Sequence, residues 1–183
     1  NIVFRAKIDG MNEYYCKMSD LDGGDVIEKS LKKFFNGERP IVACVGTDAT
    51  IGDSLGPFVG TMLTEKRAEA IIYGTLENPL TAKEISAAKK FISTVHPLSP
   101  LLVIDAAVGK SEDVGVIKIL NGAIRPGLGA NKDLPEMGSV SIIGIVSEKS
   151  LANYAFLNLT RLSPVYRMAR IVADGVMRYL KSA

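Results

Sequence analysis

Two aspartates follow short apolar runs, a placement typical of a catalytic carboxylate pair. Asp53 lies beyond the run IVACV at positions 41–45, after a polar loop, and Asp105 directly follows LLVI at positions 101–104. An apolar run without polar alternation predicts a parallel strand covered on both faces. The carboxyl ends of such strands meet at one edge of a sheet, so we expect the two side chains to converge there. A converged pair shares a proton, and one member can then activate water while the other protonates a leaving group.

Both aspartates also have purely structural interpretations. Asp53 can cap the helix that follows it, and Asp105 can bind the backbone of its own loop. The stretch GTDATIGDSLG at positions 46–56 could instead bind a phosphate at a helix N-terminus. It lacks the Gly-Lys-Ser/Thr of a P-loop and the G-x-G-x-x-G of a dinucleotide site, so nucleotide binding is the weaker interpretation.

The sequence offers little for metal or thiol chemistry. His96 is the only histidine, and no Cys or Glu stands beside it at a ligand spacing. Cys44 falls inside an expected strand, where a thiol is usually inert. We therefore predict neither a metal site nor a cofactor.

Helical and strand patterns alternate along most of the chain, and they must position the two aspartates. This alternation predicts an α/β fold, a three-layer α/β/α sandwich with a mostly parallel central sheet, in a single domain over 1–183. Residues 1–24 are an N-terminal arm or a strand. The expected strands are 41–45, 71–74, 101–105 (ending on Asp105), 116–120 and 140–146, and the expected helices are 25–35 (capped by Asp25), 53–67, 81–94, 151–159 and 163–180 (capped by Ser163).

A loop of unusual length, residues 121–138, is the other candidate for function. Structureless loops of this length are uncommon in compact domains and are often functional. We expect it to border the cleft of the two aspartates. With the loop after the first strand, it supplies the expected substrate-binding residues, which are Thr47, Asp48, Gly127, Gly129 and Lys132.

Composition excludes several classes of protein. The net charge of +2 is too small to predict direct nucleic-acid binding or attachment to an anionic membrane. No apolar run approaches the roughly 20 residues of a membrane span, and no signal segment begins the chain. Two cysteines are too few for a disulfide framework, so we expect a cytoplasmic protein. A homo-oligomer stays open.

Three motifs carry a resemblance to a known family. GTDATIGDSLGP, LLVIDAAVG and RPGLGANKDLPEMGSVSIIGIV resemble the bacterial spore germination protease superfamily, and more closely its shorter sporulation relative, the YyaC family. The resemblance covers roughly residues 40–180. It implies an unusual aspartic-type endopeptidase that cuts small acid-soluble spore proteins, with catalytic aspartates at Asp53 and Asp105.

The resemblance extends to the fold of hydrogenase maturation proteases. Those enzymes bind the nickel of their substrate through an acidic residue, an Asp and a later His. Asp53 and Asp105 match the first two ligands, but no His follows Asp105. The chain is also shorter than a germination protease. The alternative is therefore a sporulation protein that binds a peptide or protein partner without cleaving it.

Overall fold

We describe the protein from a computed structural model, for residues 7–8, 11–126, 134–149 and 160–183. The predicted helix 151–159 and residues 1–6 and 9–10 of the predicted N-terminal arm lie outside these ranges. The described elements, in chain order, are β1 (Lys7–Ile8), β2 (Met11–Lys17), α1 (Gly23–Phe35), β3 (Ile41–Cys44), the 3₁₀ turn η1 (Ile51–Asp53), α2 (Leu55–Glu65), β4 (Ile72–Tyr73), α3 (Ile85–Val95), β5 (Leu101–Gly109), the 3₁₀ turn η2 (Ser111–Asp113), β6 (Val116–Leu120), β7 (Val140–Glu148) and α5 (Leu162–Leu180).

The strands form one sheet in the order β1-β2-β6-β7-β5-β3-β4. Strands β7, β5, β3 and β4 are parallel neighbours, whereas β6 pairs antiparallel with both β7 and β2. The predicted α/β class and mostly parallel sheet are confirmed in this coarse form. The reversal at β6 was not predicted. It arises because only the short turn η2 links β5 to β6, and a parallel return needs a long crossover.

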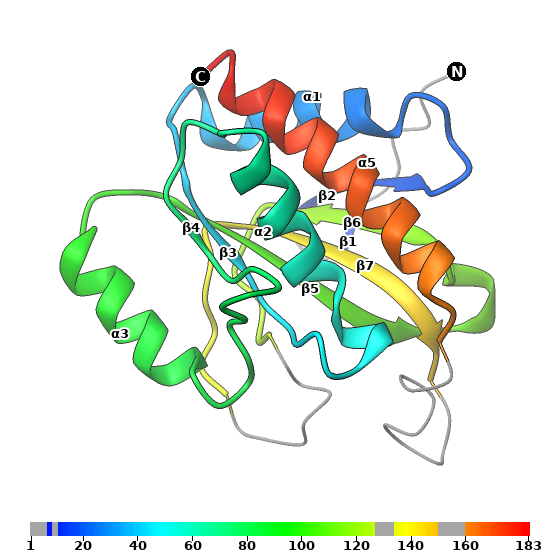
Figure 1. The fold of residues 1–183 in the computed structure, drawn as a ribbon. Coiled ribbons are helices and arrows are strands. Elements are labelled where there is room, and N and C mark those ends of the chain that lie inside the picture. Colours follow the sequence, from blue (N-terminus) through cyan, green and yellow to red (C-terminus); the bar gives the residue numbers. More distant parts are fainter. Residues whose placement is uncertain (1–6, 9–10, 127–133, 150–159) are drawn as a thin grey trace.

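Helices cover both faces of the sheet and so form three layers (Figure 1). Alternate residues of β3 divide between two apolar cores: Val42 and Cys44 pack beneath α1, α2 and α5, and Ile41 and Ala43 pack beneath α3. This division arises because successive side chains of a strand point to opposite faces of the sheet. It explains why the strand had to be apolar without interruption.

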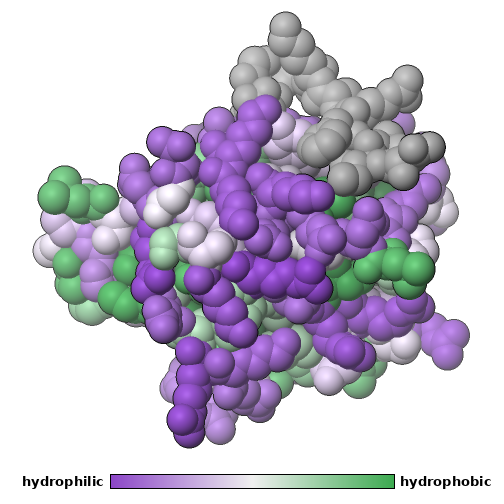
Figure 2. Space-filling model, turned by 90° about the horizontal axis from the view of Figure 1, so that it is seen from above, coloured by the Kyte–Doolittle hydropathy of each residue, from purple (hydrophilic) through white to green (hydrophobic). Residues whose placement is uncertain are grey.

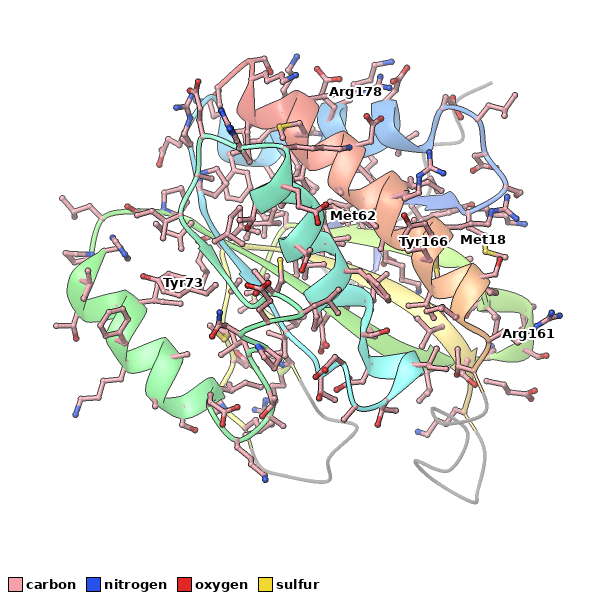
Figure 3. The ribbon with its side chains drawn as sticks, in the orientation of Figure 1. Met18, Met62, Tyr73, Arg161, Tyr166 and Arg178 are labelled. Carbon is pink, nitrogen blue, oxygen red and sulfur yellow. The ribbon has the colours of Figure 1, made fainter. Side chains whose placement is uncertain are left out.

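The longest helix, α5, joins the other helices of its layer. A Cβ atom added to Gly175 would lie 2.6 Å from the Ile27 side chain, so α5 and α1 pack with little space between them. Arg178 forms ion pairs with Asp25 of α1 and, at 2.8 Å, with Asp174 (Figure 3). Hydrophilic side chains accordingly crowd the face seen from above in Figure 2. Among the described helices, none is both long and apolar enough to cross a membrane.

Helix boundaries differ from the predictions by up to four residues. Helix α1 begins at Gly23, so Asp25 lies in its first turn and Asp22 holds the cap position. Helix α5 begins at Leu162, so Ser163 is not its cap. Helix α3 begins only at Ile85, because Thr81 and Glu84 form a turn before it, in which the Thr81 N–H donates to the Glu84 carboxylate at 3.1 Å.

Candidate active site

The loop after β3 folds back tightly onto the start of α2. Gly46 has φ +139°, and a Cβ atom there would lie 2.0 Å from the Asp53 carbonyl oxygen. The Thr47 N–H donates to the same oxygen at 3.0 Å. A side chain at position 46 is therefore excluded both by the backbone angle and by the neighbouring chain. These contacts hold Asp53 close to the end of β3.

The sequence predicted a helix that begins at Asp53, but Asp53 lies before the helix. It ends the turn η1, and Ser54 holds the cap position of α2. The interpretation of Asp53 as the cap of that helix is therefore wrong. Its side chain is partly buried. Burial raises its pKa from 3.8 to about 6, and a hydrogen bond from the Thr47 backbone opposes part of that rise.

Asp105 lies within a strand and not at its end. Strand β5 continues to Gly109 because β7 continues to pair with it, and Asp105 is opposite Ile143 in that register. The carboxylate is buried, with 6% of the residue exposed, and its Oδ1 accepts the N–H of Ala106 at 2.9 Å. Since Val103 belongs to the core beneath α3, the alternation of the strand places Asp105 on that same face.

The two aspartates come from neighbouring parts of the sheet. The last paired residue of β3, Cys44, is opposite Ile104, so Asp105 lies one step beyond the end of β3. The turn η1, which carries Asp53, packs against β5. The raised pKa of Asp53 has burial as its main cause and does not require a second carboxylate. A shared proton between the two side chains stays a prediction.

Of the five predicted substrate-binding residues, the structure describes two, and these differ in exposure. Thr47 is partly buried, and its Oγ1 accepts the Ala49 N–H at 3.2 Å, whereas Asp48 is exposed. Gly127, Gly129 and Lys132 lie outside the described residues. What the structure describes of their loop is its neck, where Ile124 and Met137 exchange two backbone hydrogen bonds of 3.1 and 2.8 Å.

An open groove of about 640 Å³ runs between this neck and helix α3. Lys89 and Lys90 line one side, and the ion pair of Arg125 with Glu136, at 3.4 Å, lines the other. Sequence reasoning missed the helical side of this groove. The available signal was the spacing of Ser86, Lys89, Lys90 and Ser93, which places four polar residues on one face of a helix.

The other two residues considered for chemistry, His96 and Cys44, have contacts typical of a structural role. His96 follows α3, and its Nε2 lies 3.0 Å from the Tyr73 hydroxyl, consistent with a connector. The Cys44 thiol is fully buried, and burial raises its pKa far above the usual range, as expected of a core thiol. Within the described ranges, no three His, Cys, Asp or Glu residues are placed to hold a metal ion.

Comparison with known proteins identifies the family. A family model described as "Protein of unknown function (DUF1256)" matches residues 15–175. The chain belongs to this family. It is also 37% identical over 152 residues to "Uncharacterized protein YyaC" of Bacillus subtilis (strain 168), a match that covers 82% of this chain and 74% of that protein. The matched region includes both aspartates, the groove and most of α5.

Proposed function

We propose that this DUF1256 protein is a spore-protease-like hydrolase that cleaves a peptide bond by means of Asp53 and Asp105. One observation carries the proposal: a partly buried carboxyl group with a pKa of about 6 lies on a turn that packs against the strand of a second, buried carboxylate. A pKa near the working pH suits a group that must both accept and return a proton. The resemblance of the motifs around both aspartates to spore germination proteases supports the same reaction.

The proposed reaction uses water as the nucleophile. Asp53 accepts a proton from a water molecule while the oxygen of that water attacks the carbonyl carbon of the peptide. Asp105, fixed in β5, orients that water and the tetrahedral intermediate. The proton then passes to the leaving amine, so that a carboxylic acid and an amine are released and both aspartates regain their starting states.

The groove beside α3 supports a peptide as the substrate. It is open to solvent, and its α3 side lies on the same side of the sheet as the core that Asp105 faces. By resemblance, the substrates are small acid-soluble spore proteins. We place the reaction in the cytoplasm of a spore-forming cell.

A second function is favoured by the position of Asp105 within β5. A carboxylate in mid-strand that binds the N–H of the next residue can serve the fold alone. The protein would then bind a peptide or protein partner in sporulation without cleaving it.

Incubation of the purified protein with a pool of spore proteins, followed by mass spectrometry, separates the two functions. We expect discrete cuts with the wild type and with Glu65→Gln, a control variant whose side chain is exposed at the end of α2. We expect no cuts with Asp53→Asn or with Asp105→Asn. If the immobilised wild-type protein binds spore peptides but cuts none of them, the hydrolase proposal is wrong and partner binding is the function.

A further inference from the structure

Helix α3 has two chemically different flanks. Lys89 and Lys90 face the groove described above. Phe91 and Val95 lie one turn apart on the other flank, because residues four apart share a helix face. These two side chains are 53% and 50% exposed, which is unusual for neighbouring large hydrophobic groups. The charges of the helix are thus directed away from its exposed apolar flank.

The apolar surface continues onto the neighbouring edge of the sheet. Strand β4 ends the strand order, and the ring of its Tyr73 contacts Phe91 edge-on at 6.2 Å (Figure 3). Ile71, two residues earlier and so on the same face, is 45% exposed, and Leu98, just beyond α3, is 94% exposed. We call Ile71, Tyr73, Phe91, Val95 and Leu98 the apolar edge. Hydrophobic side chains form the matching left-hand rim in Figure 2, on the side of α3 in Figure 1.

The size of the apolar edge fits the centre of a protein interface. Its four most exposed side chains present on the order of 400 Å² of apolar surface, comparable to the largest patch on a typical monomer. A stable interface buries about 800 Å² on each partner, with an apolar centre inside a polar rim. The apolar edge supplies such a centre, and exposed Arg67 and Glu69, which precede Ile71 in the chain, supply rim groups.

We infer that the apolar edge binds the same surface of a second copy of this chain around a two-fold axis. In such an isologous contact the same surface of both copies forms the interface, so an apolar surface is its own complement. The two α3 helices pack through Phe91 and Val95, while their lysines face the grooves. The net charge of +2 gives little long-range repulsion between the copies. A strongly charged partner would find no counter-charge among Ile71, Tyr73, Phe91, Val95 and Leu98.

Molar mass from light scattering tests the inference. We expect the wild type to have about 39 kDa, twice the chain mass of 19.6 kDa, and Phe91→Glu to have the single-chain mass with an unchanged circular dichroism spectrum. Leu21→Glu is the matched control, because Leu21 is 107% exposed but lies outside the apolar edge. It should leave the dimer intact. A wild type that has the single-chain mass throughout the micromolar range overturns the inference.

A disulfide crosslink locates the interface without disturbing the apolar ring. The chain has two cysteines, Cys16 and Cys44, and both are buried, so a third cysteine provides the accessible thiol. Under mild oxidation Val95→Cys should form a covalent dimer at dilute protein, and Leu21→Cys should not. Equal crosslinking of the two variants, or none in either, refutes a two-fold axis beside α3.

Discussion

Replacement of Asp53 by Asn should stabilise the protein above pH 6 but not at pH 4. Burial raises the pKa of this carboxyl from 3.8 to about 6 in the folded protein. Between these two values the unfolded chain has released its proton and the folded protein still holds it. The free energy of unfolding therefore falls as the pH rises through this window, and it levels off above about pH 6.

The size of the effect follows from the same two pKa values. Each unit of difference corresponds to about 1.36 kcal/mol, so the ionised carboxyl costs at most about 3 kcal/mol of folding free energy. Asp53 is only partly buried, and water contact lowers the expected cost to about 2 kcal/mol. Asparagine keeps the shape and a hydrogen-bond acceptor for Thr47, but it carries no charge. The stabilisation above pH 6 should raise Tm by roughly 4–8 °C.

Urea unfolding of the wild type and of Asp53→Asn at a series of pH values is the assay. We expect the two curves to coincide near pH 4, to separate between pH 4 and 6, and to run in parallel above that. Asp48→Asn, exposed in the same loop, controls for the general effect of losing one negative charge. A difference between Asp53→Asn and the wild type that does not vary with pH would refute burial of the Asp53 carboxyl as the cause.

Two further variants test the local packing. Gly60→Ala should lower the free energy of unfolding by about 3 kcal/mol or more, because the added Cβ would lie 1.8 Å from the Gly74 carbonyl oxygen. Gly37→Ala is the control: Gly37 lies in open space at φ +88°, so the added Cβ should cost only about 1 kcal/mol. Equal losses in urea unfolding would contradict the close approach of α2 to β4. Thr81→Ala should cost about 1 kcal/mol by removing the hydroxyl that binds Glu84 before α3, and thermal unfolding that matches the wild type would show the contact to be without value.

The order of the elements could be predicted because each depends on a local pattern. Continuous apolar runs identified the buried strands β3 and β5, and helical spacing identified α1 and α5. A strand was one of two interpretations for residues 1–24, but β2 was not located there, since its sequence MNEYYCK mixes polar and apolar residues at an antiparallel side of the sheet. Such a strand is stabilised by the partner that it meets and not by its own composition.

For the candidate site, the sequence determined which carboxylates stand beside buried strands, because strand burial and residue type are both local properties. Only the tertiary structure decided that Asp105 lies within β5 and not in a loop: the strand is extended by the backbone hydrogen bonds of β7, which is more than thirty residues away in the chain. Tertiary packing also decided the raised pKa of Asp53, since desolvation depends on all the atoms that surround a group. The exposed flank of α3 has the same origin, because its hydrophobic spacing is that of a buried helix and only the sheet edge beside it leaves Phe91 open to water.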